Sequence, residues 1–346
     1  MKPDQSFGPP TLPLLRRVAP AIGLFFIAPL VAEFLLGDLP ITMLGALVLL
    51  APFYGGGALV IREVVRRTGR GWPSIFVLAF SYAVLEEAFT TQTLFNPNYL
   101  GLNLHLLESA YIPALGMGVW WTIFVLTLHT VWSISTSIGL AESLVPERAT
   151  RPWLGRVGLG VVSILFVLAA VESTRYAIEH DRNHFVASKA QFLSAAIICL
   201  LAIVTAFLLP KRRVSAGASG YVPGPWLVGC VALAAGSIFL LIPNKWGWLA
   251  VALYLVLDVA VIALIVHWSH RLGWNSRHRL ALAGGAALAY GWHAFIQNPV
   301  VGNAGIINRI GNGLFVLGLG IILAIASRRT NAWEERSELQ PESLAT

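Results

Sequence analysis

The sequence predicts an all-α fold: a polytopic membrane helix bundle of about ten transmembrane helices, with both termini cytoplasmic. Three observations predict it. The 346 residues are 56% hydrophobic and only 12% charged, whereas a soluble domain carries about 25% charged residues. Apolar runs of about 17–23 residues, long enough to span lipid as helices, recur along the chain. Basic residues cluster between alternate runs, which indicates the orientation of the bundle.

The apolar runs are continuous and lack the in–out alternation of membrane β-barrel strands. A helix satisfies its own backbone hydrogen bonds in lipid, so we expect every run to be helical. In chain order the runs cover residues 18–36, 41–61, 74–95, 117–139, 155–171, 190–210, 226–242, 247–267, 280–296 and 312–327.

The net charge of +7 is a topology signal. With the N-terminus inside, ten crossings place all but five of the 24 Lys and Arg residues on the cytoplasmic side. The five exceptions are Arg175, Arg182, Lys189, Lys245 and Arg309. The pattern predicts an integral protein of a bacterial plasma membrane, with the lipid bilayer as its partner and no nucleic-acid partner.

We expect a single integral membrane domain covering residues 1–346. Residues 1–15 form a polar N-terminal tail, 211–225 a cytoplasmic loop between possible halves, and 328–346 a charged cytoplasmic C-terminal tail. The outer segment 95–116 carries no Lys or Arg and has leucines at near-helical spacing. It is either an ordinary surface loop or a short interfacial helix or lid.

Two adjacent glutamates, Glu86 and Glu87, interrupt the third run. An ionisable residue in a membrane span is costly, needs a partner and indicates a functional site. Two close carboxyl groups repel each other, so the pair can hold one proton, as a general acid and base would. The alternative is structural: one glutamate bonds to a neighbouring helix and its twin reaches polar surroundings.

His129 lies near the middle of the fourth run, at a depth similar to the glutamates, and Trp132 shares its helical face. We therefore predict that His129 works with Glu86 and Glu87. Other polar residues of the outer half could join the same site, while Asp258, at the centre of the eighth run, could belong to it or pair elsewhere. His293 is a fourth catalytic candidate, and the supporting or substrate-binding candidates are Glu33, Asn96, Trp132, Asp258, Gln297 and Asn298.

Over about residues 74–140 these residues resemble the CPBP family of glutamic intramembrane proteases, the CAAX-processing and bacteriocin-protection enzymes. The family pattern is EExxxR, then FxxxH, then HxxxN. Glu86 and Glu87 match the first pair, His129 the second motif, and His293 is the best candidate for the third. The sequence departs from the pattern at Thr91, which stands where the arginine would be.

The other two motifs also depart from the pattern. Phe124 stands five residues before the second-motif histidine, and His293 is followed by Gln297 and then Asn298. The resemblance implies that Glu86 or Glu87 acts as general base on a water oriented by the second-motif histidine. It further implies that His293 with Gln297 or Asn298 stabilises the oxyanion. The substrate would be a peptide bond at the membrane surface.

Two other functions stay open. A secondary transporter or proton- or cation-coupled permease could use Glu86, Glu87, His129 and Asp258, with a helix break at the Tyr-Gly-Gly-Gly sequence of residues 54–57. A non-enzymatic scaffold would use the same polar residues to hold helices together. Carboxylate and imidazole ligands suit Zn²⁺ or Mn²⁺, so the sequence assures no cofactor and leaves a metal open. The substrate, a membrane-associated peptide or a small molecule, and the oligomeric state are not determined.

Overall fold

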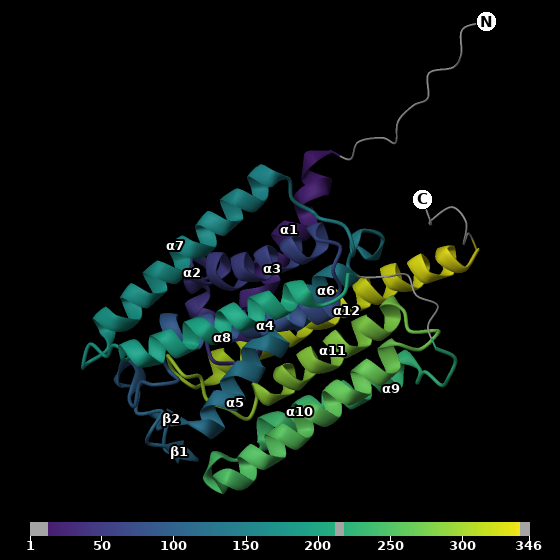
Figure 1. Cartoon of the computed structure of the whole chain (residues 1–346). Helices are drawn as coiled ribbons and strands as arrows, with labels where there is room; N and C mark the ends of the chain where they lie inside the picture. The colour runs from purple at the N-terminus through teal and green to yellow at the C-terminus, as the bar shows by residue number, and fades with distance from the viewer. Residues whose placement is uncertain (1–12, 212–217, 340–346) are drawn as a thin grey trace, which may run out of the picture.

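The computed structural model describes residues 13–211 and 218–339. Each of the ten predicted runs lies on helix (Figure 1). The helices in chain order are α1 (Leu14–Pro29), α2 (Leu47–Leu50), α3 (Gly56–Arg67), α4 (Trp72–Leu85), α5 (Val119–Leu128), α6 (Ser137–Ser143), α7 (Arg156–His180), α8 (Lys189–Leu208), α9 (Pro225–Leu241), α10 (Trp248–Ser269), α11 (Ser276–His293) and α12 (Ile306–Leu339).

The predicted all-α membrane bundle is confirmed. Among the described residues, eight helices are long and apolar enough to cross a membrane. The two predicted runs that are not among these eight are α9, which has only 17 residues, and α11, which begins with the polar sequence Ser-Arg-His-Arg. The predicted number of ten spans therefore stays a prediction.

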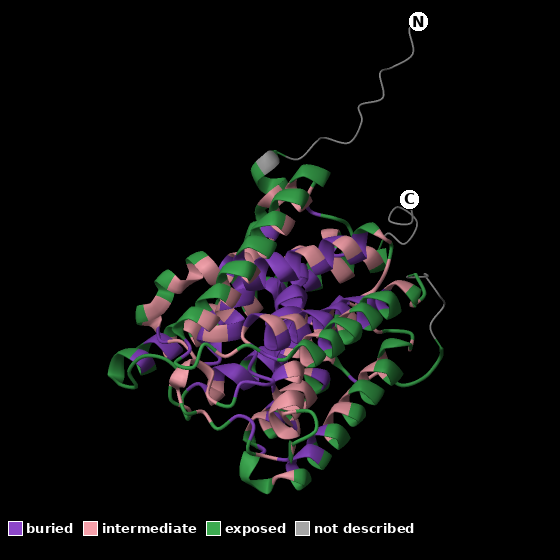
Figure 2. Cartoon of the chain, turned by 60° about the vertical axis from the view of Figure 1, so that its left-hand side comes forward, coloured by how far each residue is buried: buried purple, intermediate pink, exposed green. Residues whose placement is uncertain are grey.

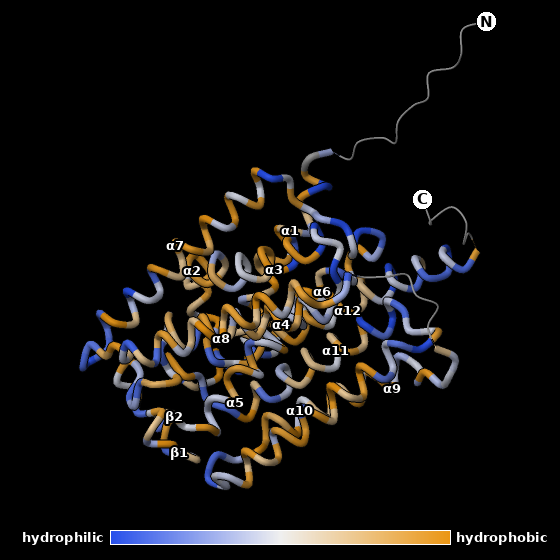
Figure 3. Tube along the Cα trace, in the orientation of Figure 1, coloured by the Kyte–Doolittle hydropathy of each residue, from blue (hydrophilic) through white to orange (hydrophobic). Residues whose placement is uncertain are grey.

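Four spans form the centre of the bundle, with 50–67% of their most apolar stretches buried. They are Leu15–Leu35, Ile41–Arg67, Trp72–Thr90 and Val119–Ser143. In α7, α8, α10 and α12 that share is only 11–22%, and Figure 2 shows the buried residues gathered between these outer helices. Apolar residues run along the outer helices, and hydrophilic residues gather at helix ends and loops (Figure 3). This distribution suits helices whose outer faces contact lipid.

The beginning of α1 and the end of α12 lie at the same end of the bundle, which we call the basic end (Figure 1). Arginines there join segments distant in sequence. Arg148 donates to the carbonyl of Arg16 at 3.0 Å, and Arg70 donates to the carbonyl of Phe207 at 2.5 Å. The basic clusters therefore gather at one end, as the orientation argument requires. That this end faces the cytoplasm stays a prediction.

The predicted tails lie partly outside the described residues, as does the middle of the 211–225 loop. Within the predicted C-terminal tail, residues 328–339 continue α12 as regular helix. Glu334 explains why the helix is retained there. Its carboxylate accepts the backbone N–H of Ser276 at 2.9 Å, at the first residue of α11.

Residues 91–118, which we call the cap, connect α4 to α5 at the other end of the bundle (Figure 1). They include a small hairpin in which β1 (Tyr111–Ile112) pairs antiparallel with β2 (Met117–Gly118). The interfacial-helix alternative for this segment is wrong, because repeated left-handed backbone conformations interrupt it. Five non-glycine residues have φ between 51° and 57°: Gln92, Leu100, Asn103, His105 and Ala110.

Asp181 fastens the cap to the turn between α7 and α8. Its Oδ2 accepts the Asn96 amide at 2.9 Å and the Leu100 N–H at 3.1 Å. Its Oδ1 accepts the N–H groups of Asn183 and Phe185 at 2.9 and 3.3 Å. Burial alone would raise the pKa of Asp181, but these hydrogen bonds outweigh it and hold the pKa below its ordinary value. Asn96 was expected in the functional site, but its side chain instead joins the cap to Asp181.

At the basic end a buried set of charged residues ties α3 to α6 and to the segment after it. The Arg62 guanidinium is fully buried and lies 3.1 Å from Glu142 Oε1 and 2.7 Å from Glu63 Oε1. It also stacks over the Trp153 ring, with 3.2 Å from Cζ to the ring centroid. Arg66 pairs with both oxygens of Glu142 at 2.9 and 2.7 Å.

We call these residues (Arg62, Glu63, Arg66, Glu142 and Trp153) the arginine cluster. Its remaining polar atoms are also occupied. Glu63 accepts the backbone N–H of Trp153 at 2.7 Å, and Arg62 donates to the carbonyls of residues 148, 149 and 151 at 2.9–3.2 Å. The two buried guanidinium groups balance the two buried carboxylates, and the partly exposed Arg67 lies 3.5 Å from Glu63 Oε2 at the edge of the cluster.

Candidate functional site

Glu86 and Glu87 lie where α4 continues as a π-helical turn, η4 (Glu86–Thr90). The N–H of Thr91 bonds to the carbonyl of Glu86 at 2.9 Å, the i to i+5 spacing of such a turn. Both glutamates are buried, with 2% and 3% of their surface exposed. Adjacent helical residues point about 100° apart, so one partner can reach both carboxylates only by lying between them.

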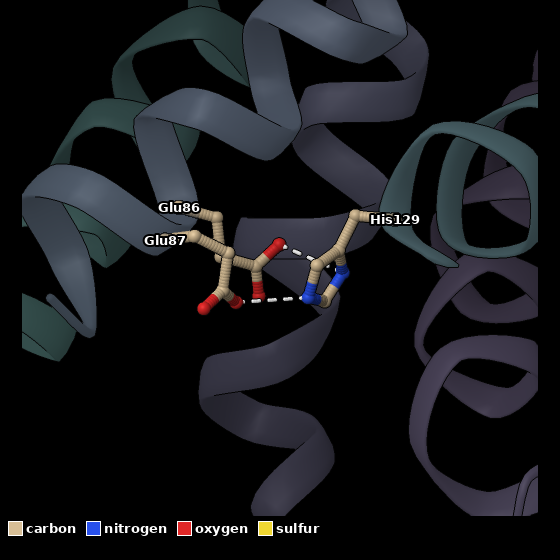
Figure 4. Close-up of side chains that lie close together, drawn as sticks. All are labelled: Glu86, Glu87 and His129. Atoms are coloured by element: carbon tan, nitrogen blue, oxygen red, sulfur yellow. Dashed lines mark ion pairs between the residues drawn. The ribbon is translucent and has the colours of Figure 1, made fainter. Parts of the chain in front are cut away.

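His129 faces both carboxylates from the opposite helix, and Figure 4 shows one ion pair from its ring to each of them. Its Nδ1 lies 3.1 Å from Glu86 Oε2, and its Nε2 lies 2.9 Å from Glu87 Oε1. Nδ1 also lies 3.0 Å from Ser133 Oγ, one turn along the same helix. The predicted association of His129 with the glutamate pair is therefore present in the structure, with one ring nitrogen directed at each carboxylate.

Tyr54 connects the pair to a third carboxylate. Its hydroxyl lies 2.6 Å from Glu33 Oε1 and also contacts Glu86 Oε1. A phenol has one proton to donate, so holding both contacts requires a proton on one of the two carboxyl groups. The Tyr54 ring also stacks on the His129 ring, with centroids 6.0 Å apart. We call Glu33, Tyr54, Glu86, Glu87 and His129 the glutamate cluster.

Every residue of the glutamate cluster lies in a π-helical turn. Glu33 is in η1 (Leu30–Leu35), Tyr54 in η3 (Ala51–Gly55), and His129 begins η6 (His129–Thr136). These turns are rare and are frequently found at functional sites. At η3 the close approach needs glycine, because a Cβ at Gly55 would lie 2.0 Å from the carbonyl oxygen of Phe25.

The far oxygen of Glu87 faces the cap. Glu87 Oε2 accepts a hydrogen bond from Thr91 Oγ1 at 3.2 Å and another from the Thr93 hydroxyl. Thr93 Oγ1 in turn accepts the indole N–H of Trp121 at 3.0 Å. Glu87 is therefore hydrogen-bonded on both oxygens, whereas Glu86 Oε2 accepts no hydrogen bond and has only the His129 ion pair.

The glutamate cluster contains more carboxyl groups than basic groups. In the described part of the chain, His129 is the only basic side chain paired with Glu86 or Glu87. Three carboxylates beside one imidazole would leave net negative charge in a buried place, so protons or a cation must neutralise it. One ligand atom from each of Glu86, Glu87 and His129 lies within 4.8 Å of the others. Such a set of carboxylate and imidazole ligands suits Zn²⁺ or Mn²⁺.

Two predicted residues lie apart from the glutamate cluster. Asp258, on α10, accepts a hydrogen bond from Thr127 Oγ1 at 3.2 Å. Trp132 donates its indole N–H to the carbonyl of Ala286 at 2.8 Å and stacks on Tyr290, with ring centroids 4.8 Å apart. Trp132 therefore packs α11 against η6, although it shares a helix with His129.

The third-motif residues are not joined to the glutamate pair. His293 ends α11 with a buried Nδ1 that has no hydrogen-bond partner, and Asn298 is exposed. Gln297 instead donates to Asp38 Oδ1 at 2.7 Å and to the carbonyl of Leu36 at 2.9 Å. Gln297 thus holds the turn that follows η1, near the Glu33 end of the cluster.

Asp38 lies in that turn, between the first two spans, and is partly exposed. Burial raises the pKa of Asp38 to about 7, and the charge of Glu33 adds to the effect, while the Gln297 hydrogen bond opposes it. The N–H of Val300 bonds to the Asp38 carbonyl at 3.0 Å, which fixes the turn against the α11–α12 connection. Asp38 therefore titrates near neutral pH at the edge of the membrane-spanning region.

Residues 24–309 match the model of an uncharacterised membrane protein family. The chain belongs to this family. No curated protein and no solved structure matches it. The matched range contains the whole glutamate cluster and the arginine cluster, so both belong to the part of the chain that the family model describes.

Sequence reasoning missed Tyr54 and Asp38 as functional candidates. Tyr54 directly precedes three glycines inside an apolar run, a place where a helix break was already expected. A tyrosine at such a break has its hydroxyl free to reach a buried partner, which is the signal that could have identified it. Asp38 gives no comparable signal, because an acidic residue between two spans is ordinary.

Proposed function

We propose that this protein is a membrane-embedded hydrolase of the glutamic-peptidase type, acting on a peptide bond at the membrane surface. The observation that carries the proposal is the pairing of one imidazole with two adjacent carboxylates: His129 lies 3.1 Å from Glu86 and 2.9 Å from Glu87. A positioned carboxylate beside an imidazole is suited to general acid–base catalysis in a site closed to bulk water.

Glu86 is the general base of the proposed reaction. Its Oε2 is buried and has no partner besides the ion pair with His129 Nδ1 at 3.1 Å, so a lone pair of this oxygen remains to take a proton from a water. The water O–H bond breaks, the oxygen bonds to the peptide carbonyl carbon, and the proton stays on Glu86. When the C–N bond breaks, the proton passes to the leaving amine, so protons and charges balance.

Glu87 and His129 position the reacting groups. Glu87 is held by Thr91 and Thr93, and it fixes the imidazole through Nε2. The oxyanion role implied for His293 has no support from its contacts, and both ring nitrogens of His129 already face carboxylates, so we assign that role to no residue. Thr91 stands at the position where the CPBP pattern has an arginine. Its hydroxyl donates a hydrogen bond to Glu87 without bringing a positive charge.

The transporter and scaffold alternatives have less support. A permease built from two equivalent halves would use Asp258 together with the glutamates, yet Asp258 bonds Thr127 on the side of α5 that faces α10. A scaffold would need polar residues only to join helices. The arginine cluster is built in that way, with balanced charge and occupied atoms, and the glutamate cluster is not.

The test is a peptidase assay on the full chain in lipid vesicles, with a library of quenched fluorescent peptides. We expect Glu86→Gln, Glu87→Gln and His129→Ala to lose about 100-fold or more of the wild-type rate. Asp258→Asn, which also neutralises a carboxylate within a span, is the matched control and should keep the rate. Equal rates in all four variants would contradict the proposal.

Elemental analysis of the same preparations separates acid–base from metal chemistry. The glutamic mechanism predicts no stoichiometric metal in wild type. About one zinc or manganese per chain, lost in His129→Ala, would instead assign Glu86, Glu87 and His129 as metal ligands and replace the glutamic mechanism by metal-assisted hydrolysis.

A further inference from the structure

A pocket of about 420 Å³ lies where α11 ends and α12 begins. The end of α12 is at the basic end of the bundle, so its beginning, and the pocket with it, lies at the cap end (Figure 1). Residues 294–298, 304–306, 308 and 309 line the pocket. No member of the glutamate cluster is among these lining residues, so the pocket is a separate site.

One wall of the pocket is the first turn of α12. The first four N–H groups of an α-helix have no acceptor within the helix. In α12 the N–H of Arg309 bonds to the carbonyl of Gly305 at 3.1 Å, and the N–H groups of residues 306–308 bond to no other described backbone group. Gly305 has no side chain to cap them, and a Cβ there would meet no atom within 4 Å. These open donors suit an anion.

Arg309 adds a positive charge to the same turn. Its side chain lines the pocket, is exposed, and forms no ion pair or hydrogen bond with the described residues. It is also one of the few basic residues that the charge pattern places away from the basic end. None of the described residues that line the pocket is acidic. A guanidinium group beside free helix donors favours a phosphate, which it can bind through paired N–H groups.

Asn308 and Gln297 line the pocket and require a donor rather than an anion. Only 5% of the surface of Asn308 is exposed, and its Oδ1 is buried without a hydrogen-bond partner. A buried acceptor without a donor destabilises the protein. The Gln297 amide nitrogen donates to Asp38 Oδ1 and to the Leu36 carbonyl, so Gln297 offers the pocket only its oxygen. A ligand that suits both sides therefore carries a phosphate and, next to it, an N–H or O–H group.

Apolar residues on the rim indicate where such a ligand comes from. Phe295, Ile296 and Ile306 line the pocket and are exposed, and Ile310 is exposed one turn further along α12. Exposed apolar side chains on a membrane-spanning helix face the lipid. A ligand of this pocket thus has its polar part against α12 and an apolar part against the membrane, as a phospholipid does.

We propose that this pocket binds the headgroup of a phospholipid from the leaflet at the cap end. The phosphate lies against the beginning of α12 and Arg309, and a donor of the headgroup bonds to Asn308 Oδ1. Phosphatidylethanolamine and phosphatidylglycerol have such a donor beside the phosphate, whereas phosphatidylcholine has none. The site goes beyond the proposed hydrolase function and does not depend on it.

The test measures lipid binding to the purified full chain in detergent by native mass spectrometry. Phosphatidylethanolamine and phosphatidylcholine with identical acyl chains are added in separate titrations, and the Kd of the first bound lipid is determined. We expect phosphatidylethanolamine to bind about tenfold more tightly, because only its headgroup supplies the donor that Asn308 lacks.

Two variants and a control assign the binding to this pocket. Arg309→Gln should weaken the binding of phosphatidylethanolamine by about tenfold or more, as expected for the loss of a hydrogen bond between two charged groups. Asn308→Leu should abolish the preference over phosphatidylcholine and keep the melting temperature, because it removes a buried polar atom without a partner. Arg182→Gln removes another exposed arginine at the cap end and should bind as wild type does.

A competition with glycerophosphoethanolamine, the same headgroup without acyl chains, distinguishes a lipid from a soluble phosphate ester. Lipid that stays bound in a large excess of this competitor supports a phospholipid ligand. Displacement at equal concentration would assign the pocket to a soluble phosphate ester instead. Equal affinity of wild type and Arg309→Gln for phosphatidylethanolamine would overturn the site. Equal affinity of wild type for the two lipids would overturn the role of Asn308.

Discussion

The arginine cluster and the glutamate cluster are both buried, charged and built from the central spans, but they are organised in opposite ways. In the arginine cluster two cations face two anions, and the Arg62 guanidinium is occupied on all sides. In the glutamate cluster there are three carboxyl groups and one imidazole, which pairs with two of them, and Glu86 Oε2 has no partner besides that imidazole. The arginine cluster has its polar atoms paired and its charges balanced, which suits a structural role. The glutamate cluster has excess carboxyl groups, which can bind a proton or a ligand.

The two clusters also differ in the type of helix that carries them. Arg62, Glu63 and Arg66 lie in regular α-helix, as does Glu142. The members of the glutamate cluster all lie in π-helical turns. A buried charge therefore does not by itself indicate function. The charge balance, the free atoms and the local helix type distinguish the two clusters.

The largest expected effect is on stability, at the arginine cluster. Glu142→Leu leaves the Arg62 and Arg66 guanidinium groups without their shared partner, so we expect a loss of about 3–5 kcal/mol in the free energy of unfolding. Denaturation in detergent measures it. The double variant Arg66→Met with Glu142→Leu should recover part of the loss, and a single variant as stable as wild type would contradict the structural role.

A smaller loss is expected at the attachment of the cap. Asp181→Ala removes the acceptor of four hydrogen bonds to the cap and its neighbouring turn. Bonds to a charged group are worth about 1.5–3 kcal/mol, so we expect a loss of that size at pH 7. Hydrogen exchange of the cap backbone should rise. Unchanged exchange at residues 96–103 would show that the cap is held elsewhere.

The contribution of Asp181 depends on pH in a defined direction. Its pKa is lowered in the folded protein, so its stabilisation is present above the unfolded value of about 3.9 and is lost as pH falls through the folded value. The stability difference between wild type and Asp181→Ala should therefore shrink in acid. If the stability difference between the two proteins stayed constant to within ~1 kcal/mol down to pH 2–3, this linkage would be contradicted.

Asp38 is expected to show the opposite pH dependence, with a smaller effect. Its folded pKa of about 7 lies above its ordinary value of 3.8, so the folded state binds more protons and stability falls as pH rises between the two values. Asp38→Asn should remove this fall and be the more stable protein at pH 8. We expect a difference of about 1 kcal/mol, below the full linkage value, because Asp38 is partly exposed. Parallel pH profiles for the two proteins would contradict it.

The smallest stability effect is expected where the functional effect is largest. Glu86→Gln keeps the shape of the side chain and replaces a carboxyl group in a cluster with excess negative charge. We expect its free energy of unfolding to stay within about 1 kcal/mol of wild type, in contrast to Glu142→Leu. Breaking a balanced buried ion pair costs about 3–5 kcal/mol. If Glu86→Gln lost that much stability, the glutamate cluster would behave like the arginine cluster, and the argument for a functional site would fail.

Much of the fold could be predicted, because hydropathy alone marks where helices must lie. The ten apolar runs all fall on helix, and the basic loops gather at one end as expected. Two local features could not be read from hydropathy. Residues 328–339 continue α12, because Glu334 bonds to the beginning of α11. The cap is not helical, because left-handed residues such as Leu100 interrupt it. Both depend on contacts between distant segments, which hydropathy does not contain.

The site was only partly predictable. Glu86, Glu87 and His129 could be grouped from their similar depth in neighbouring spans, and the structure brings them together. Depth in the membrane did not predict the partners of Asp258 and His293. Both lie in apolar runs, but Asp258 bonds Thr127 and His293 has a buried Nδ1 without a partner. Which face of a span meets which neighbour depends on helix rotation, and the π-helical turns change that rotation without any clear mark in the sequence.

The π-helical turn η6 has one further consequence, for insertions and deletions. Such a turn holds one residue more than the α-helix it interrupts, so losing a single residue between His129 and Thr136 can be absorbed by a return to regular α-helix. Losing a residue from the regular helix α6 before Glu142 would instead rotate Glu142 by about 100°, away from Arg62. The spacing between the two clusters should therefore tolerate a deletion in η6 far better than one in α6.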